Sequence, residues 1–524
     1  MDVKKRPDKF NATNLFVDRH IEEGRGAKVA IYYLDEQITY SEVQEKVNQT
    51  GNALKEIGVG LEDRIMLLLL DCPEFVYSFF GAMKIGAVPI PTNTLLKPED
   101  YEYLLNDSRA KVIVVSEDLL ENITAIRNDL LYLRKIIVVG KPAEDCLSFD
   151  SLVKDKSTEL ETANTGKDDA AFWLYSSGTT GFPKGVVHLH HDMEVSAELY
   201  AKGVLQISEN DITYSVAKLF FAYGLGNGLY FSFYVGASTV LSPNRPLPEH
   251  VYSTIVKYKP TLFFGVPSSY AAMVQLAGAK EKYDLSSIRY CASAGEPLPK
   301  VVFDRWLEKW NLEILDGIGS TEILHIFISN MPGDIRPGST GKIVPGYKAK
   351  IIDEEGNVVP AGDVGTLMIK GHSTAAYYWN KHEKTIETFI GKWINTGDQY
   401  YQDNDGFFWY VGRGDDMIKA GGIWVSPVEV EYCLLEHPAV FESGVIGRAD
   451  EDGLIKPKAF VVLQEGYEPS GDLEIELSLF VKSKIAPYKF PRWLEFVSDL
   501  PRTATGKIQR FKLRQIDKPP SINM

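Results

Sequence analysis

Short runs of Val, Ile and Leu alternate with segments of helical periodicity along most of this 524-residue chain. Residues 64–70 form one such run, apolar residues recur at helical spacing over residues 73–86, and a second run follows at residues 87–90. Alternation of this kind is typical of α/β layers with largely parallel sheets. We therefore expect a large N-terminal region of parallel-rich sheets flanked by helices. The same series continues with strands at residues 111–115, 135–139, 170–175, 238–241, 261–264, 287–294 and 312–315, and with a helix near residues 251–258.

The pattern changes after residue 340. Strands are expected at residues 348–353 and 358–359 around a turn, and then at residues 365–370 and 406–411. A helix is expected to begin near Ser426-Pro427, because proline suits the first helical position. We therefore divide the chain into a large multi-layer domain with a β-rich subdomain, residues 1–414, and a small, mobile α+β domain, residues 415–524.

Composition and charge exclude several classes of function. The net charge is −15, which argues against non-specific nucleic-acid binding. The four cysteines show no C-x-x-C spacing, which is typical of reduced thiols in a cytoplasmic protein. Residues 1–10 lack the apolar core of a signal peptide, and the run at residues 65–70 is far too short to span a bilayer. We therefore expect no membrane partner, while the oligomeric state stays open, a homodimer included.

One glycine-rich stretch, WLYSSGTTGFPKGVVHLHHDM (residues 173–193), predicts contact with phosphate. It is not a Walker A loop, in which Ser or Thr follows the lysine. Glycines let backbone N–H groups close around an anion, and a lysine adds charge. A flexible surface linker is the alternative, but a strand-like run precedes the stretch and Val186-Val187 follows the lysine. The residues that we expect at the phosphates are Ser176, Ser177, Gly178, Thr179, Thr180 and Lys184.

Three histidines follow within this stretch, His188, His190 and His191, and they raise the alternative of a zinc site. Apart from Asp192, no cysteine or carboxylate stands at a recognisable ligand spacing. We therefore expect these histidines in the turn and helix start after the loop.

Three further stretches combine glycine with an acidic side chain. DGIGSTE (residues 316–322) follows a strand, so that Glu322 can either hold Mg²⁺ through oxygen or support the first turn of a helix. NTGDQY (residues 395–400) offers Asp398 at a strand–loop junction, as a ribose ligand or as an ordinary turn residue. SAGEPLP (residues 293–299) places small residues and an acid where a strand ends and a helix would begin with proline. A ligand site and an ordinary helix-start turn explain this stretch equally well.

The last two motifs lie toward the C-terminus. YVGRGDDMIKAGG (residues 410–422) flanks charged residues with glycines, as a hinge between domains requires. PRTATGKIQR (residues 501–510) places Lys507 behind Gly506. Lys507 is either a residue of the functional site or part of a solvated basic face.

In this order, the motifs resemble those of the adenylate-forming enzymes, which include acyl- and aryl-CoA ligases, carrier-protein adenylation domains and firefly luciferase. YSSGTTGFPKGV and GRGDDMIKAGG are highly specific to that family, and the resemblance runs from Thr39-Tyr40-Ser41-Glu42 to Lys507. KLFFAYGLGN (residues 218–227) and DGIGSTEILHIFISN (residues 316–330) resemble benzoate-CoA ligases. The resemblance implies a carboxylate that attacks ATP-Mg²⁺ to give an acyl-adenylate, and coenzyme A that then displaces AMP.

The resemblance also implies roles for residues. Lys507 reaches the reacting groups, Thr321 touches the α-phosphate and Glu322 coordinates Mg²⁺. Rotation of the small domain about Asp415 then withdraws Lys507 for the second step. The other implied residues are the phosphate-loop residues above; Ala294, Gly295, Glu296, Asp316, Gly317, Ile318 and Gly319 at adenine; Asp398 and Arg413 at ribose; and Lys419, Ala420, Gly421 and Gly422 on the coenzyme A side.

The expected acid pocket is aromatic and small, with one imidazole and no fixed charge. It suits a flat neutral ring, so that benzoate leads and hydroxy- or aminobenzoates follow. Phe221 replaces a histidine of many relatives, whereas His325 either contacts the ring or packs in the core. Ligases for medium-chain acids, a module that loads a separate carrier protein, and a non-enzymatic adenylate sensor stay as alternatives. The pocket candidates are Phe221, Ala222, Tyr223, Gly224, Ala294, Gly317, Gly319, Ile323, Leu324 and His325.

Overall fold

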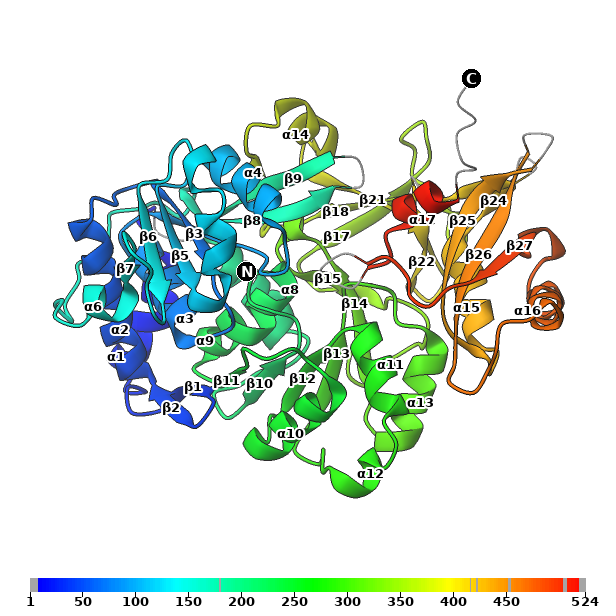
Figure 1. Ribbon diagram of the computed structural model, residues 1–524, viewed down its shortest axis with the longest axis horizontal. Coiled ribbons are helices and arrows are strands. Elements are labelled where there is room, and N and C mark those ends of the chain that lie inside the picture. Colours follow the sequence, from blue (N-terminus) through cyan, green and yellow to red (C-terminus); the bar gives the residue numbers. More distant parts are fainter. Residues whose placement is uncertain are drawn as a thin grey trace.

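The computed structural model describes residues 8–178, 181–414, 416–420, 423–450, 454–502 and 507–517. Two parallel-rich sheets form the body of the molecule (Figure 1). The first is parallel throughout, in the order β4-β3-β5-β6-β7. Its strands are β3 (Arg64–Leu68), β4 (Val88–Pro91), β5 (Val112–Ser116), β6 (Lys135–Val139) and β7 (Leu147–Ser148).

The second sheet has nine strands in the order β16-β15-β14-β13-β12-β10-β11-β1-β2. Its six central strands are parallel, and the antiparallel strands β2, β15 and β16 lie toward its two edges. The strands are β1 (Val29–Tyr33), β2 (Glu36–Thr39), β10 (Ile212–Ser215), β11 (Ser238–Leu241), β12 (Leu262–Gly265), β13 (Tyr290–Ser293), β14 (Ile314–Gly319), β15 (Ile326–Ser329) and β16 (Lys342–Ile343).

Two antiparallel sheets complete the large region. β17, β18, β20, β21 and β22 form the β-rich part that the sequence predicts after residue 340, and β19 pairs with the β8–β9 hairpin. The strands are β8 (Ala170–Gly178), β9 (Gly181–Leu189), β17 (Lys348–Ile352), β18 (Gly365–Lys370), β19 (Tyr377–Tyr378), β20 (Phe389–Ile390), β21 (Trp393–Gln402) and β22 (Phe408–Arg413).

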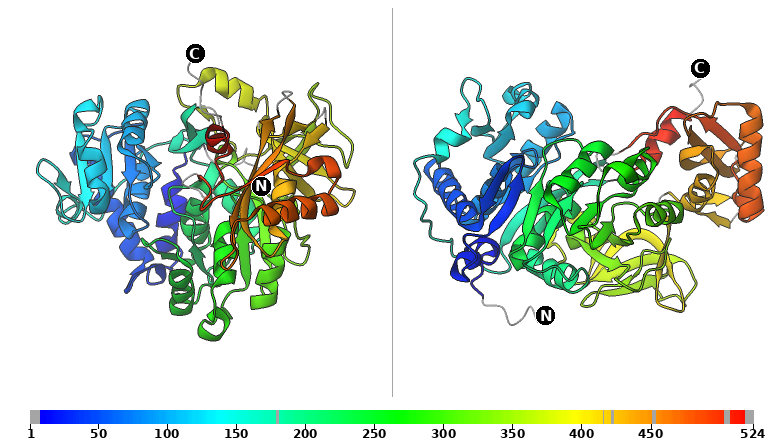
Figure 2. Two further views of the ribbon diagram at one scale, coloured as in Figure 1. Left: turned by 45° about the vertical axis from the view of Figure 1, so that its right-hand side comes forward. Right: turned by 90° about the horizontal axis from the view of Figure 1, so that it is seen from below.

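The C-terminal part is a separate domain at one end of the long axis, coloured orange to red in Figures 1 and 2. Its helices pack on their own strands around a hydrophobic cluster of its own that includes Val430, Leu434, Val445, Leu477 and Val481. The strands are β23 (Ile418–Ala420), β24 (Ile423–Val425), β25 (Val440–Ala449), β26 (Ile455–Leu463) and β27 (Trp493–Phe496).

Helix starts follow local rules that can be read in the sequence. Five helices begin with proline at the first helical position, where its missing N–H removes no hydrogen bond. Thr39 and Glu42 form a reciprocal capping box at the start of the 17-residue helix α2. The helices are α1 (Arg19–Glu22), α2 (Tyr40–Glu56), α3 (Pro73–Lys84), α4 (Pro98–Ser108), α5 (Leu120–Thr124), α6 (Phe149–Val153), α7 (Asp192–Ser196), α8 (Ala222–Leu225), α9 (Phe231–Val235), α10 (Pro248–Tyr258), α11 (Pro267–Gln275), α12 (Ala279–Lys282), α13 (Lys300–Trp310), α14 (His382–Thr388), α15 (Pro427–Leu435), α16 (Gly471–Lys484) and α17 (Arg510–Ile516).

Short π-helical and 3₁₀ segments join these elements. In the part of the chain that the structure describes, no helix is long and apolar enough to cross a membrane. The short segments are η2 (Asn14–Asp18), η3 (Glu117–Leu119), η4 (Arg127–Asp129), η5 (Ala197–Lys202), η6 (Gly226–Tyr230), η7 (Thr321–Ile323) and η8 (Pro487–Lys489).

The α/β alternation predicted from the sequence is confirmed, with one strand in error. The expected strand at residues 358–359 is reduced to an isolated bridge between Ile352 and Val358. Val359 packs against the core and its N–H donates to the Ile351 carbonyl at 3.0 Å, but Val358 is exposed and Pro360, which has no N–H, follows, so that the pairing does not extend into a strand.

Candidate functional site

One cavity of about 1660 Å³ lies between the large body and the small domain. It opens beyond the carboxyl ends of the parallel strands β13 and β14, where ligands bind in open α/β sheets. The β8–β9 hairpin, β21, β22 and the small domain close its other sides. The predicted site residues that line it are Ser176, Lys184, Phe221, Gly295, Glu296, Asp316, Gly317, Ile318, Gly319, Thr321, Glu322, Asp398, Arg413 and Lys507.

Some predicted positions lie elsewhere or are not described. Thr179, Thr180, Asp415, Gly421 and Gly422 lie outside the described residues. The structure describes the backbone of four further positions, as strand β8 for Ser177 and Gly178 and as strand β23 for Lys419 and Ala420. The described cavity lining stops short of Ala222, Tyr223, Gly224, Ala294, Ile323, Leu324 and His325.

Glu322 stands on the 3₁₀ turn η7, directly after β14. Its Oε1 accepts a hydrogen bond from the Tyr378 hydroxyl at 2.7 Å, and the Ser176 hydroxyl lies 3.4 Å from the same oxygen. Among the described residues, none donates a hydrogen bond to its Oε2. A carboxylate with the Ser176 hydroxyl nearby, in a cavity that Thr321 also lines, is the kind of oxygen donor set that fits Mg²⁺.

Lys184 reaches the same corner of the cavity from β9. Its Nζ lies 4.6 Å from the centre of the Tyr378 ring. Burial lowers the pKa of Lys184, Glu322 opposes this shift, and Lys384 and Arg413 add to it. A cation that is partly desolvated and close to other cations gains most from an anionic ligand, which fits the predicted phosphate contact.

The three histidines behind this corner contact backbone groups, and His188 and His191 also share the Asp192 carboxylate, with its two oxygens at 2.8 and 3.2 Å. His188 is fully buried, and its two ring nitrogens lie 2.8 Å from the Thr321 carbonyl and 2.8 Å from the Asp192 carboxylate. His191 lies between two backbone carbonyls, and His190 accepts a hydrogen bond from a backbone N–H. The prediction of a turn and helix start is wrong for His188, which lies in β9 because its side chain belongs to the buried face of that strand. Among the described residues, no group of three His, Cys, Asp or Glu side chains is placed to hold a metal ion.

Asp398 and Arg413 face each other across β21 and β22. The Arg413 Nη1 donates to Asp398 Oδ1 at 3.0 Å and to the Thr396 carbonyl at 3.0 Å. Gly397 has φ +73°, and a Cβ there would lie 3.0 Å from Arg413 Nη2. Burial raises the pKa of Asp398, and Arg413 and Lys507 oppose the shift. The expected strand–loop junction at Asp398 is wrong, because β21 continues through a bulge to Gln402.

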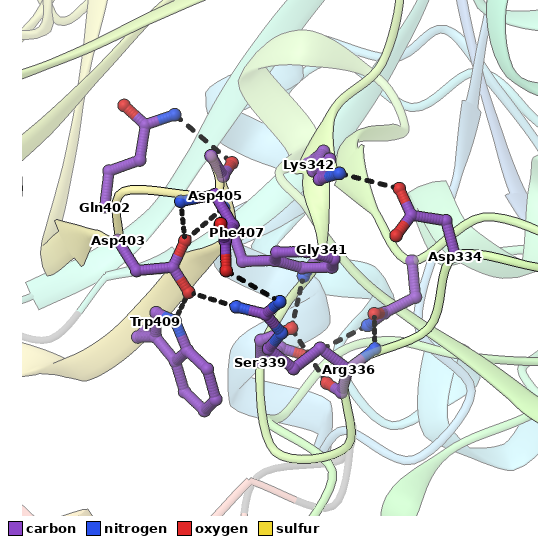
Figure 3. Close-up of polar contacts among 12 residues, drawn as sticks. Asp334, Arg336, Ser339, Gly341, Lys342, Gln402, Asp403, Asp405, Phe407 and Trp409 are labelled. Carbon is purple, nitrogen blue, oxygen red and sulfur yellow. Dashed lines mark hydrogen bonds and ion pairs between the residues drawn. The ribbon is translucent and has the colours of Figure 1, made fainter.

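An ion-pair cluster joins this hairpin to the segment after β15 (Figure 3). The Arg336 guanidinium donates to Asp403 at 2.8 Å and to Asp405 at 3.0 Å, in the turn between β21 and β22. It also stacks 4.1 Å from the Phe407 ring centre, while Trp409 donates to Asp403. The cluster therefore ties the strands that carry Asp398 and Arg413 to the segment that follows η7 and β15.

Two carboxyl groups in the cavity have strongly raised pKa values. Burial raises the pKa of Asp316 to about 8, and the contacts that oppose the shift are hydrogen bonds such as that from the Leu298 N–H rather than a basic side chain. Burial likewise raises the pKa of Glu296 to about 7, although Arg502 and Lys507 of the small domain oppose it. At neutral pH Asp316 is therefore a neutral hydrogen-bond donor, and Glu296 faces the cations of the other domain.

The predicted adenine glycines are explained by packing within the sheet. A Cβ at Gly317 would lie 2.9 Å from the Ile328 carbonyl, and one at Gly319 would lie 2.7 Å from the His325 carbonyl carbon and oxygen. Both contacts are with β15 or the residue before it, so close approach of the neighbouring strand requires glycine whether or not a ligand is present.

His325 belongs to a buried aromatic cluster. It is 2 % exposed, and its Nε2 lies 3.2 Å from the Tyr223 carbonyl. Phe231 packs against it at 4.4 Å, and Tyr200 and Tyr223 at 5.5 Å each. Burial lowers the pKa of His325 to about 3, so that the ring is neutral. Of the two interpretations left open by the sequence, the structure favours the packed histidine.

Residues of α15, α17 and the segment before α17 bring the small domain to the cavity. The Tyr432 hydroxyl on α15 donates to the Pro297 carbonyl of the large domain at 2.8 Å, and Lys507 lines the cavity. Arg510 on α17 pairs with Glu431 at 2.7 Å, and it also reaches Asp416, beside the predicted hinge. This arrangement brings Lys507 close to the carboxylates of Glu296 and Asp398.

Sequence reasoning missed Tyr378 and Tyr432. Tyr432 carries no motif at all. Tyr378 stands in the aromatic run Tyr377-Tyr378-Trp379, where alternation in a short strand predicts one buried and one exposed tyrosine. That pattern locates a strand but does not identify Glu322 as the partner, because 56 residues separate them.

Comparison with known proteins covers nearly the whole chain. The model of the AMP-binding enzyme family matches residues 17–379, and that of the AMP-binding enzyme C-terminal domain matches residues 429–507. The chain is 48% identical to benzoate–CoA ligase of Thauera aromatica over 514 residues, which cover 97% of each chain. The fold is similar to that of the anthranilate CoA ligase AuaEII in complex with anthranoyl-AMP, with a TM-score of 0.95, 47% identity and coverage of 98% and 99% of the two chains. It is also similar to a benzoate CoA ligase from Burkholderia xenovorans LB400, with a TM-score of 0.90, 44% identity and coverage of 96% and 100%.

Proposed function

The chain belongs to the AMP-binding enzyme family, and we propose that it activates benzoate with ATP and coenzyme A to give benzoyl-CoA, AMP and pyrophosphate. Adenylate-forming CoA ligases use ATP, Mg²⁺ and coenzyme A. One observation carries the assignment to this chain. A single cavity is lined by one residue from each of five sequence motifs: Lys184, Glu322, Asp398, Arg413 and Lys507.

In the first step, a benzoate oxygen attacks the α-phosphorus of ATP, a P–O bond forms, and pyrophosphate leaves. Both reactants are anionic, so cations must hold them together. Lys507 is proposed to bridge the carboxylate and the phosphate and to stabilise the charge that develops, an effect on the order of 3 kcal/mol for a single donor of this kind. Lys184 and the glycine-rich hairpin are proposed to bind the outer phosphates.

The ribose and the metal take the remaining polar groups. Asp398 and Arg413 are proposed to bind the ribose hydroxyls, since an acceptor and a donor lie side by side there. Bound Mg²⁺ neutralises phosphate charge, and Glu322 with its neighbouring hydroxyls would hold it. Thr321, whose carbonyl is held by His188, is proposed to contact the α-phosphate.

In the second step, the thiol of coenzyme A attacks the acyl carbon, a C–S bond forms, and AMP leaves. Lys507 is not needed for this step. We propose that the small domain rotates about Asp415, withdraws Lys507 and brings the strip of residues 419–422 to the site. The contact between the Tyr432 hydroxyl and Pro297 would then break, because it joins the two domains in the present arrangement.

The choice of acid rests on an apolar wall. Phe221, Gly317 and Gly319 all line the cavity, and they are the apolar members of the predicted acid pocket that do so. His325 is neutral and already bonded to the Tyr223 carbonyl. Phe221, Gly317 and Gly319 offer no polar side-chain atom to a ring substituent, so that a hydroxyl or amino group on the ring would need a partner that this wall does not supply.

Acid-dependent ATP–pyrophosphate exchange tests the function, followed by addition of coenzyme A. The panel is benzoate, 2- and 4-hydroxybenzoate, 2-aminobenzoate, cyclohexanecarboxylate and hexanoate. We expect exchange to be strongest with benzoate, and AMP and benzoyl-CoA to accumulate once coenzyme A is present. A preference for 2-aminobenzoate or hexanoate would overturn the substrate and keep the chemistry, whereas no exchange with any acid would overturn both.

Three features stay predictions. They are the cytoplasmic location, the oligomeric state, for which a homodimer is one alternative, and the use of free coenzyme A rather than a carrier protein. Light scattering in solution distinguishes a monomer of 58.7 kDa from a dimer, and transfer to free coenzyme A excludes an obligatory carrier.

A further inference from the structure

Tyr378 occupies a defined place beside the phosphate hairpin. It belongs to the two-residue strand β19, which pairs with β9 so that Tyr378 lies opposite Val186. Side chains alternate along a strand, and the two tyrosines point to opposite faces. Tyr377 is 42% exposed, whereas Tyr378 is 3% exposed. The pair therefore offers one buried tyrosine at the cavity and one surface tyrosine as its neighbour.

The hydroxyl of Tyr378 contacts Glu322 and also forms a hydrogen bond with the Thr388 side chain. It donates to Oε1 of the carboxylate at 2.7 Å, a short charge-assisted bond. An ordinary phenol keeps its proton at neutral pH, so the Tyr378 hydroxyl is the donor and the Glu322 carboxylate is the acceptor of this bond. With Oε1 held in this way, Oε2 is the oxygen that stays available to a cation.

The ring of Tyr378 acts on Lys184. The ammonium Nζ lies 4.6 Å from the ring centre, within the range of a cation–π interaction. Phe389 supports the ring edge-on at 5.3 Å. One side chain therefore orients both a carboxylate that fits Mg²⁺ and a lysine that fits phosphate, from an element that contributes nothing to the glycine-rich motif itself.

We propose that Tyr378 is a positioning residue for the Mg²⁺–ATP complex: its hydroxyl fixes the Glu322 carboxylate, and its ring fixes the Lys184 ammonium. This inference rests on the proposed function, since it assigns Glu322 to the metal and Lys184 to the phosphates. The competing explanation is a buried tyrosine that only fills space under β19. The two explanations differ because a space-filling ring does not depend on its hydroxyl.

Three variants separate the hydroxyl, the ring and the neighbouring position. Tyr378→Phe removes only the hydroxyl, Tyr378→Leu also removes the aromatic face, and Tyr377→Phe is the matched control. Binding of ATP is measured by calorimetry with saturating Mg²⁺ and again in EDTA, and thermal unfolding checks the fold. The Mg²⁺ concentration that gives half-maximal pyrophosphate exchange is measured in parallel.

We expect Tyr378→Phe to raise the half-saturating Mg²⁺ concentration by about tenfold, as loss of a partner of a metal ligand does. ATP binding in EDTA and the unfolding temperature should stay at wild-type values, because the ring still holds Lys184. Tyr378→Leu should weaken ATP binding also in EDTA, and Tyr377→Phe should match wild type throughout.

The proposal is overturned if Tyr378→Phe matches Tyr377→Phe in its Mg²⁺ dependence. It is also overturned if Tyr378→Phe weakens ATP binding equally with Mg²⁺ and in EDTA, because the hydroxyl would then act through packing. Failure of the proposed function is distinguishable from both results. A wild-type chain that shows no acid-dependent exchange fails as a benzoate ligase, while the calorimetric comparison of the variants still decides the role of Tyr378.

Discussion

At the scale of single residues, the cavity combines charged side chains with a carboxyl group that is neutral. Lys184 and Lys507 bring positive charge to a cavity that also holds the carboxylates of Glu322 and Asp398. Asp316, in contrast, has a pKa raised to about 8 by burial and is neutral at pH 7. The site can therefore bind a polyanion without placing a further negative charge beside it.

Lys507→Ala should separate the two half-reactions. We expect benzoyl-adenylate formation to fall by about 100-fold or more, because the lysine acts on charge that develops only in that step. Formation of benzoyl-CoA from supplied benzoyl-adenylate should change little. Single-turnover assays of each half-reaction measure the two rates. An equal loss in both steps would contradict the withdrawal of Lys507 in the second step.

Asp316→Asn should change how stability depends on pH. The folded pKa of about 8 is above the ordinary value of 3.8, so the carboxyl stabilises the fold fully below pH 4, and this contribution is lost as the pH rises to about 8. Asparagine keeps the shape and does not titrate. Relative to the variant, wild type should lose about 2 kcal/mol of unfolding free energy between pH 6 and pH 8. Urea unfolding at the two pH values checks this, and a pH-independent difference would show that the carboxyl is ionised in the folded state.

At the scale of elements, the β21–β22 hairpin is held in place mainly by contacts outside its own strands. The Arg336 guanidinium donates to Asp403 and to Asp405, which lie in the turn of the hairpin. The Phe408 N–H donates to the Gly341 carbonyl at 2.8 Å. The segment that supplies these contacts continues from η7 and β15, where Glu322 lies. The proposed ribose side and metal side of the site are thereby linked through one cluster (Figure 3).

Arg336→Met should loosen that link while leaving an apolar side chain over Phe407. We expect KM for ATP to rise severalfold and KM for benzoate to stay unchanged, since Phe221 is carried by other elements. Backbone amide exchange should accelerate in β21 and β22, which hydrogen–deuterium exchange with mass spectrometry measures. Lys257→Met is the control, because it removes an ion pair to Asp35 on another surface. Unchanged exchange in the hairpin would show that pairing with β18 alone holds these strands.

At the scale of the whole molecule, the small domain closes over the cavity and contributes to it directly. Glu296 faces Arg502 and Lys507 across the interface, and Tyr432 donates to the Pro297 carbonyl. The small domain has its own hydrophobic core, so it can move as a unit. The described arrangement, with Lys507 at the cavity, is the one that the role proposed for this lysine in the first half-reaction needs.

Tyr432→Phe should shift the balance between domain arrangements. One hydrogen bond that exists only in the present arrangement is worth about 1 kcal/mol, a factor of about five in the equilibrium. We therefore expect adenylate formation to slow by up to that factor, with thioester formation from supplied adenylate unchanged or faster. Single-turnover rates and the distance between fluorophores on the two domains measure the effect. Tyr467→Phe is the control, because Tyr467 is exposed on the small domain, and equal behaviour of the two variants would contradict this role of Tyr432.

The sequence by itself determined the elements and the kind of chemistry. Apolar runs predicted β3, β4, β5 and β6 of the first parallel-rich sheet and β11, β12, β13 and β14 of the second, since periodicity and turn residues are local properties. They missed β7 in the first sheet and β1, β2, β10, β15 and β16 in the second. The glycine-rich stretch and the motifs around Glu322, Asp398 and Lys507 identified the family, which the comparisons confirm. The prediction was wrong for residues 358–359 and for the positions of His188 and Asp398 within their strands, where strand pairing and burial decide the outcome.

Only the tertiary structure decided which side chains meet and in what state. Tyr378 meets Glu322 across 56 residues, and His188 meets Thr321 across 133 residues. The raised pKa of Asp316 and the neutral, packed state of His325 both follow from burial. Contact between distant residues and loss of hydration depend on how layers pack against each other. That packing is a property of the whole fold, and no local pattern of residues encodes it.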